Sequence, residues 1–458
     1  MVAIITAETK KRFVDEFKND ADSASVRYYI GISRSEDWNS TDTAPTPLNT
    51  EKEQRDFRHG LQSVKRVDNY SFVIPRENWV ANTPFATYSD TAIGHPTVPY
   101  YAMTENNAVY VCLRQGINAT TGAAVNSTVQ PTGSSTIPFT TSDGYAWKFL
   151  YTIGTLDAGR YKSANFIPVK LQGATDSSSP ATDVEQLAIQ NAASTGREVV
   201  GFSLDSGGEG YTSSSITVTI IGNGTLAAGT AIRNESTQKV VAIRIADSAS
   251  TLKMGSGYDF ANVTLSGGGA TKQAAGKVIL GPKGGFGANP TNDLRARAVM
   301  FNVKPVGEEK PSVDSDGEFI IGNSFRQIGL LRDPTDSAGS LFTEEDGNCL
   351  RRLQMASGAP SFSQRAIITG GASGAKAFVD KTDSDEIYYH QTESTGFTQF
   401  NAAESISGNS GGSGSVGSTV FVEPKVDKYS GQLLYIENRA AVIRAADQTE
   451  DIKVIIEI

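Results

Sequence analysis

Short stretches in which apolar and polar residues alternate recur along this chain, and long segments rich in Gly, Ser, Thr, Asn and Pro separate them. Such alternation occurs at residues 26–32, 147–153 and 452–458. A period of two is typical of strands with one apolar face, and the 45 glycines provide turns between strands. The sequence therefore predicts a mainly β fold, with β-sandwich-like domains, long loops and a few short helices.

At 458 residues the chain is long enough for about three domains. We predict an N-terminal β-rich domain with a leading helix over residues 1–175. A helix and an inserted β-repeat module follow over 176–285. A C-terminal β domain over 286–458 is expected to pack on the N-terminal domain. Within it, residues 405–418 are rich in Gly and Ser, which favours a flexible loop.

Two helices have recognisable start signals. Thr6 can cap a helix that runs from Ala7 to about Asn19. Thr182 and Glu185 fit a capping box for a second helix, and Gly196 can end it.

An internal repeat defines the inserted module. Residues 200–204, a Gly208-Glu209-Gly210-Tyr211 turn and residues 216–220 are followed by residues 241–245, a Gly255-Ser256-Gly257-Tyr258 turn and residues 263–265. Both copies share the order strand, Gly-x-Gly-Tyr turn, strand. Because a unit of this size cannot bury an apolar face alone, we expect the two copies to pack together.

The charge and hydropathy patterns narrow the range of partners. The net charge is −9, and the short runs Lys10-Lys11-Arg12 and Arg351-Arg352 are better interpreted as solvated or packing residues than as phosphate contacts. We therefore expect no nucleic-acid partner. No signal peptide is recognisable, and no apolar run approaches the roughly 20 residues that span a membrane, so no membrane partner is expected. Cys112 and Cys349 lie in apolar segments, which indicates buried thiols of a protein made in a reducing cytosol.

Residue patterns that support chemistry are missing from the sequence. His59, His95 and His390 lack the spacing of metal ligands, and no Cys-x-x-Cys, Gly-x-Ser-x-Gly or phosphate-binding loop motif occurs. Residues 412–417 match a dinucleotide-binding pattern, but no helix signal follows them. The acidic segments 314–318 and 380–386 lack the spacing of a calcium loop and are interpreted as solvated turns. We predict no catalytic residues, no cofactor, no bound metal and no enzymatic activity; a hydrolase whose paired carboxylates are distant in sequence remains an alternative.

Several blocks of this chain resemble, in the same order, the baseplate wedge subunits of T-even-like contractile-tailed bacteriophages. These blocks are residues 28–33, 73–79, 109–113, 143–151, 281–290, 324–331, 429–439 and 447–458. The resemblance implies a non-enzymatic, mainly β structural protein that forms homodimers and joins other wedge proteins, and through them the tail fibres. It also implies synthesis in the bacterial cytoplasm, a final location in the virion baseplate, and a part in the rearrangement that triggers sheath contraction.

Leu433, Leu434, Tyr435 and Ile436 form the most apolar part of the terminal block. They are apolar enough to contribute to an interface, but burial in the core is the favoured reading. An alternative function is a receptor- or glycan-binding tail protein in which the Gly-x-Gly-Tyr repeats form the binding module.

Overall fold

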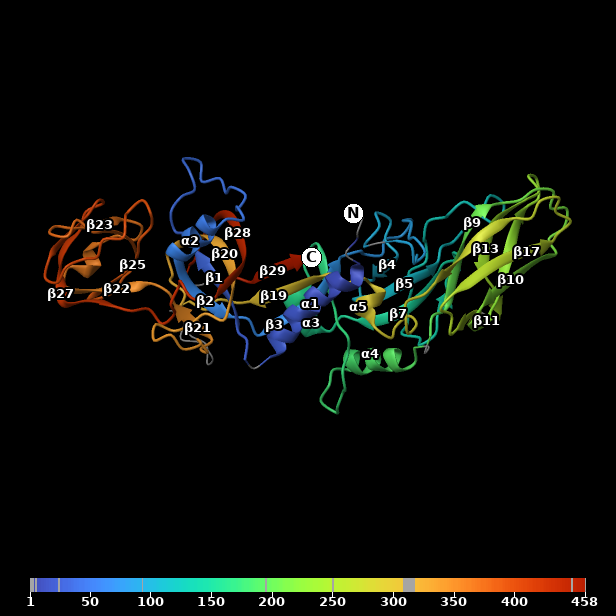
Figure 1. The fold of residues 1–458 in the computed structure, drawn as a ribbon, viewed down its shortest axis with the longest axis horizontal. Coiled ribbons are helices and arrows are strands. Elements are labelled where there is room, and N and C mark those ends of the chain that lie inside the picture. The colour runs from blue at the N-terminus through green and yellow to red at the C-terminus, as the bar shows by residue number, and fades with distance from the viewer. Residues whose placement is uncertain are drawn as a thin grey trace. The chain divides into compact units, whose positions relative to one another are not determined.

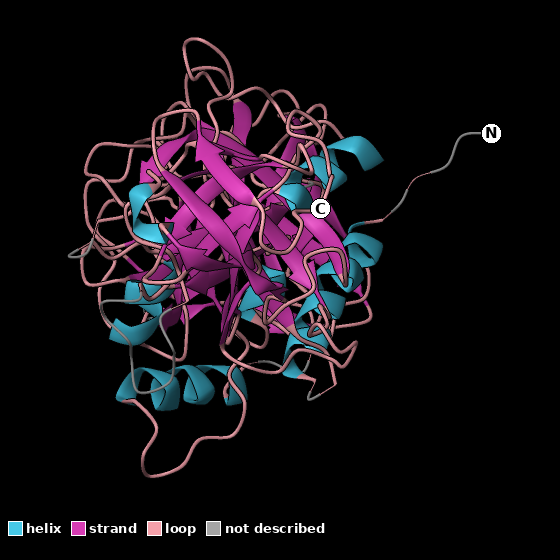
Figure 2. Cartoon of the chain, turned by 90° about the vertical axis from the view of Figure 1, so that its left-hand side faces the viewer, coloured by secondary structure: helices cyan, strands magenta, loops and turns pink. Residues whose placement is uncertain are grey.

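The computed structural model describes residues 4, 6–23, 25–92, 94–193, 196–248, 251–307, 318–445 and 448–457. Strands make up 41% and helices 11% of the protein, which confirms the mainly β prediction (Figures 1 and 2). None of the described helices is both long enough and apolar enough to cross a bilayer.

Contacts divide the chain into two compact units. The first unit comprises Met1–Val14, Ser71–Met300 and Ile456–Ile458, and the second comprises Asp15–Tyr70 and Phe301–Ile455. These units do not follow the predicted boundaries at residues 175 and 285. The chain passes between the units within regular elements, which composition does not mark: α1 (Ala7–Asp22), β3 (Asn69–Pro75), β19 (Ala298–Val303) and β29 (Ile452–Glu457).

The first unit contains a four-stranded sheet of order β4-β5-β7-β6. Its strands are β4 (Tyr101–Met103), β5 (Ala108–Arg114), β6 (Phe139–Thr140) and β7 (Ala146–Thr152). Trp147 on β7 is fully buried and meets Phe85 edge to face, with ring centroids 5.3 Å apart. Strand β8 (Phe166–Val169) pairs with β3, and α3 (Thr155–Tyr161) and α5 (Pro290–Asp293) are short helices.

The helix predicted after residue 176 is α4 (Ala181–Asn191), but its capping was predicted wrongly. The N-cap is Pro180, without a side-chain cap, and the helix ends at Asn191, well before Gly196. Because the helix begins two residues earlier than predicted, Thr182 lies inside the first turn, where its buried hydroxyl lacks a partner in the described structure. Ile189 packs into the core of the sheet.

In its described residues, the repeat forms ten strands in small antiparallel sheets, with the pairs β9–β18, β10–β17, β11–β16, β12–β13 and β14–β15. Their bounds are β9 (Val199–Ser206), β10 (Ile216–Gly222), β11 (Thr225–Ala227), β12 (Gly229–Asn234), β13 (Lys239–Ile245), β14 (Asp247–Ser248), β15 (Thr251–Leu252), β16 (Met254–Ser256), β17 (Ala261–Gly267) and β18 (Ala275–Leu280). Both Gly-x-Gly-Tyr turns have the same backbone: φ is 65° at Gly208 and Gly255, and 72° and 77° at Gly210 and Gly257. These left-handed values explain why both turns require glycine.

The two halves of the module, residues 197–234 and 238–280, interlock reciprocally. The Tyr211 N–H donates to the Gln238 carbonyl at 3.0 Å, and the Tyr258 N–H donates to the Arg197 carbonyl at 3.1 Å. One core contains Tyr211 from the first half with Val240 and Leu265 from the second. The prediction that the two copies pack together is therefore confirmed.

The second unit contains a five-stranded sheet of order β21-β2-β1-β20-β28. These strands are β1 (Tyr28–Ser33), β2 (Leu61–Arg66), β20 (Ser324–Arg332), β21 (Asp346–Asn348) and β28 (Gln432–Ile443). Every residue of β1 is buried because β1 lies between β2 and β20. Helix α2 (Glu51–His59) packs Phe57 against Gly329 of β20, where an added Cβ would lie 2.4 Å from the Phe57 ring.

A closed six-stranded barrel of order β22-β25-β24-β23-β26-β27 also belongs to the second unit. Its strands are β22 (Arg351–Ser357), β23 (Ile367–Gly370), β24 (Lys376–Thr382), β25 (Glu386–His390), β26 (Ser405–Gly408) and β27 (Ser413–Val422), and η1 (Ala359–Ser361) is a short 3-10 helix. The prediction of a flexible loop at residues 405–418 was wrong. Ile406 and Val416 point into the barrel core, and a Cβ at Gly414 would lie 2.3 Å from the Ser357 carbonyl oxygen. The small residues thus permit close backbone approach in the barrel wall.

Candidate functional site

Strand β28 carries the predicted interface residues and forms one edge of the five-stranded sheet. It pairs with β20 on one side, and no described strand pairs with its other side. Leu433 and Ile436 pack against the core of the second unit. Leu434 is 40% exposed, and the Tyr435 hydroxyl donates to Glu437 at 2.9 Å. Of the four candidate residues, Leu433 and Ile436 therefore pack against the core, whereas Leu434 is exposed and can contact a partner.

The register between β20 and β28 is unbroken only over residues 435–438 of β28. Leu330 faces Tyr435 and Leu331 faces Leu433, so Leu434 is an extra residue at a first bulge. Phe325 of β20 faces Val442 and Gln327 faces Asn438, so three residues of β28 lie opposite Arg326. This bulge interrupts the ladder and bends the strand. An edge strand exposes unpaired N–H and C=O groups to which another strand can bind. Residues 435–438 are therefore the part of β28 best suited to such pairing.

A loop at residues 34–50 is anchored beside the second bulge of β28, at residues 439–441. The Trp38 indole N–H donates to the Arg439 carbonyl at 3.0 Å, and the Arg34 guanidinium lies over the Trp38 ring at 4.2 Å. Asn39 Oδ1 accepts the N–H groups of Thr41 and Thr43 and closes a turn. A loop with these contacts presents a defined surface to a partner.

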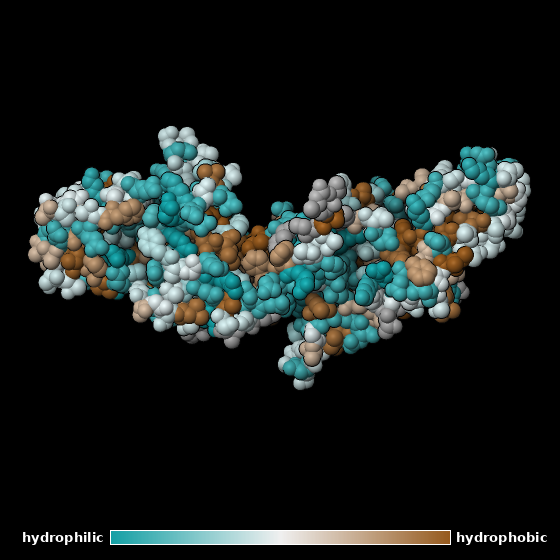
Figure 3. Space-filling view, in the orientation of Figure 1, coloured by the Kyte–Doolittle hydropathy of each residue, from teal (hydrophilic) through white to brown (hydrophobic). Residues whose placement is uncertain are grey.

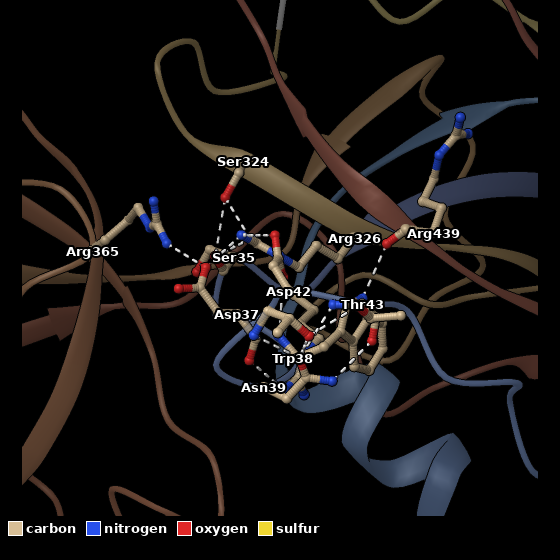
Figure 4. A network of polar contacts seen from close by, with 12 residues as sticks. Ser35, Asp37, Trp38, Asn39, Asp42, Thr43, Ser324, Arg326, Arg365 and Arg439 are labelled. Carbon is tan, nitrogen blue, oxygen red and sulfur yellow. Dashed lines mark hydrogen bonds and ion pairs between the residues drawn. The ribbon is translucent and has the colours of Figure 1, made fainter.

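Arg326 on β20 holds the base of this loop (Figure 4). Its side chain is buried, and its Nη2 and Nε lie 2.5 Å and 2.7 Å from carboxylate oxygens of Asp37 and Asp42. Its Nη1 donates to the Ser35 carbonyl at 2.5 Å. The hydrogen bond from Arg326 lowers the pKa of Asp42. A second cation, Arg365, lies 2.7 Å from Asp37.

A buried ionic cluster lies next to this network. His390 Nδ1 is 2.6 Å from Asp380 Oδ2, and His390 Nε2 is 3.2 Å from Glu36 Oε1. Burial alone would lower the pKa of His390, but the charges of Asp380 and Glu36 outweigh it and raise that pKa to about 10. Burial alone would raise the pKa of Glu36, but His390 outweighs it and lowers that pKa to about 2. With both ring nitrogens occupied by carboxylates, His390 ties Glu36 of the loop to the barrel.

The other sequence candidates have structural partners. His59 Nδ1 lies 3.0 Å from the Tyr429 hydroxyl, and His95 Nε2 lies 2.8 Å from the Leu294 carbonyl oxygen. Cys112 and Cys349 are buried free thiols, and burial raises the pKa of both. Among the described residues, no group of three or more His, Cys, Asp or Glu side chains is arranged to hold a metal ion.

The two acidic segments have different outcomes. Residues 314–317 lie outside the described residues. In the segment 380–386, Asp380 binds His390, whereas Glu386 pairs with Arg352 at 3.0 Å. The interpretation of this second segment as a wholly solvated turn was wrong, because the strands around it bury Asp380.

Sequence reasoning missed Arg326, Trp38 and Glu36, since their partners come from distant segments of the chain.

On the face shown in Figure 3, hydrophobic residues form small separate patches among hydrophilic ones. Neither a protein-family model nor a curated protein matches this chain.

Proposed function

We propose that this chain is a structural subunit of a bacteriophage tail baseplate wedge, which assembles by protein–protein contacts and takes part in the rearrangement that triggers sheath contraction. The sequence blocks behind the resemblance coincide largely with strands, among them β1, β5, β7, β20 and β29. The proposal includes homodimer formation, binding to other wedge proteins and a location in the virion. It includes no catalytic role.

The observation that carries the proposal is the free edge of β28, which is regular over residues 435–438 and presents Leu434 at the adjoining bulge. A strand from a partner can extend the sheet there, with backbone hydrogen bonds for affinity and Leu434 for side-chain contact. The anchored loop at residues 34–50 adds a second preformed surface to the same unit. Together they suit a protein whose task is to bind other proteins.

Co-expression with the other wedge proteins encoded in the same genome, followed by affinity purification, tests this proposal. We expect Leu434→Lys to reduce recovery of a partner about tenfold, because a buried charge opposes docking. Leu226→Lys is the matched control, since Leu226 is 85% exposed and lies in the repeat module of the first unit. Lack of association between the parent chain and every wedge protein would contradict the proposal.

A second candidate function is saccharide binding, which an aromatic-walled cavity of about 520 Å³ in the second unit favours. Phe397 and Tyr429 line it and are 50% and 53% exposed. The His59 ring supports both, with centroid distances of 4.9 Å and 5.8 Å. Charged and amide side chains that can bind hydroxyl groups complete the lining: Arg351, Gln391, Gln399, Glu423 and Asp427.

This cavity replaces the repeat tyrosines as the candidate sugar site. Tyr211 and Tyr258 are 0% and 4% exposed, so a sugar ring cannot stack on them. A glycan array tests the candidate. Specific binding that is lost in Tyr429→Ala and kept in Phe260→Ala, a variant of an exposed Phe in the other unit, would support it. Absence of binding to any glycan would count against it.

A further inference from the structure

A cavity of about 520 Å³ in the first unit gathers cationic side chains from four segments of the chain. Lys11 comes from α1, Arg197 precedes β9, Lys283 follows β18, and Arg295 and Arg297 follow α5. The whole chain has 41 Lys and Arg against 50 Asp and Glu, so this lining locally reverses the charge of the protein.

Cations outnumber carboxylates in the lining of this cavity. Glu8 and Asp90 are the carboxylates among its residues, and Asp90 Oδ2 accepts the Leu280 N–H at 3.0 Å. In the part of the chain that the structure describes, no ion pair involves Arg197, Lys283 or Arg297. Cations of like charge that share a concave surface repel one another and raise the potential inside it.

Arg295 supplies a cation that is fixed in place. Its Nη1 donates to the Gly94 carbonyl at 2.8 Å and its Nη2 to the Ser89 carbonyl at 2.5 Å. The guanidinium lies 5.0 Å from the centre of the Tyr88 ring and 4.7 Å from that of Tyr100. A positive charge held by two carbonyls and two rings is preorganised for an anion, since it loses no further side-chain freedom on binding.

We infer that this cavity binds a small, multiply charged oxyanion, namely a phosphate group that is free or esterified to a sugar. Arginine guanidinium groups match the planar spacing of phosphate oxygens, and Arg197 and Lys283, for which the described structure has no ion pair, can contact those oxygens. A nucleic-acid backbone would require an extended stripe of cations. Here the cations surround a single concavity. This site is independent of the proposed assembly role.

Isothermal titration calorimetry of the full chain with inorganic phosphate and with glucose 6-phosphate tests the inference. We expect saturable binding that the double variant Arg197→Gln/Lys283→Gln weakens about tenfold. Lys253→Gln, a variant of an exposed lysine in the repeat module, should bind like the parent. Tighter binding of glucose 6-phosphate would identify a phosphorylated saccharide as the ligand, and equal binding would identify the phosphate group alone.

Three results would overturn the inference: no binding of either probe at millimolar concentration, equal affinity in the double variant and the parent, or tighter binding of a single-stranded DNA oligonucleotide than of either probe. Circular dichroism of the double variant would confirm that it is folded. Because partner recovery through β28 is measured separately, failure here and failure of the assembly proposal are distinguishable.

Discussion

At the scale of single residues, the folded protein opposes ionisation of Asp293. Burial raises the pKa of Asp293 to about 8, the Gly287 N–H that Oδ2 accepts at 2.7 Å offsets part of this rise, and the charge of Glu198 adds to it. The native state therefore holds this proton more tightly than the unfolded chain does. The associated stability is present below the unfolded pKa of about 4 and is lost as the pH rises to about 8.

We predict that the free energy of unfolding falls less in Asp293→Asn than in the parent as the pH rises from about 5 to about 9. The amide cannot ionise, and its oxygen can still accept the Gly287 N–H. Urea unfolding of both proteins across this range measures the difference in free energy of unfolding. Asp205→Asn, at an exposed position of the same unit, should follow the parent. A steeper loss in Asp293→Asn would contradict the prediction.

His390 is buried like Asp293, but its protonated form is a cation, whereas protonated Asp293 is neutral. The raised pKa of His390 means that the native state binds a proton more tightly than the unfolded chain. This contribution to stability is present below the unfolded pKa of about 6.5 and is lost as the pH rises to about 10.

We predict that His390→Ala lowers the free energy of unfolding by about 3 to 5 kcal/mol near neutral pH. The reason is that Asp380 and Glu36 lose the cation between them. His59→Ala serves as the control and should cost about 1 kcal/mol, since the ring nitrogen of His59 binds a neutral hydroxyl. Denaturant unfolding measures both variants, and equal losses would contradict the assignment of His390 as an ionic clamp.

At the scale of elements, the repeat module supplies a matched pair of hydrogen bonds. The Tyr211 hydroxyl accepts the Ala274 N–H at 2.8 Å, and the Tyr258 hydroxyl accepts the Ala227 N–H at 3.4 Å. Each bond links one half of the module to the other. The shorter bond is also the more deeply buried one.

We predict that Tyr211→Phe lowers the free energy of unfolding by about 1 to 3 kcal/mol and that Tyr258→Phe costs less. Removing the Tyr211 hydroxyl leaves a buried N–H without its acceptor, whereas the weaker bond of Tyr258 contributes less. Chemical unfolding compares the two variants. A larger loss in Tyr258→Phe would show that the halves are not joined as the distances indicate.

Helix α2 and the Gly- and Ser-rich strands show how far a local sequence pattern can predict secondary structure. Helix α2 was not predicted, although Thr50 and Glu53 carry a capping signal, and Thr50 Oγ1 does accept the Glu53 N–H at 3.2 Å. Residues 405–418 were interpreted as a loop because their composition resembles a linker. Only closure of the barrel explains why Gly and Ser are needed there.

At the scale of the whole molecule, the proposed role requires self-association. We predict a homodimer in solution, measured as molar mass by light scattering after gel filtration. A symmetric dimer uses one surface twice, and the free edge of β28 can pair with its own copy in an antiparallel arrangement. If so, Leu434→Lys should shift the mass toward that of a monomer. A stable trimer would contradict this prediction and would favour the receptor-binding alternative.

The β class, several strands and the repeat are predictable from the sequence, because alternation and glycine turns are local consequences of backbone geometry. The sequence also identified β28 as apolar, but not which of Leu433, Leu434, Tyr435 and Ile436 would face the core.

Tertiary structure alone decided the division into units, the closure of the barrel and the grouping of Arg326, Glu36 and His390 with their partners. It also assembled the cationic cavity, whose members lie far apart in sequence. Strand pairing across long separations depends on which faces can be buried together, and no local pattern encodes that choice.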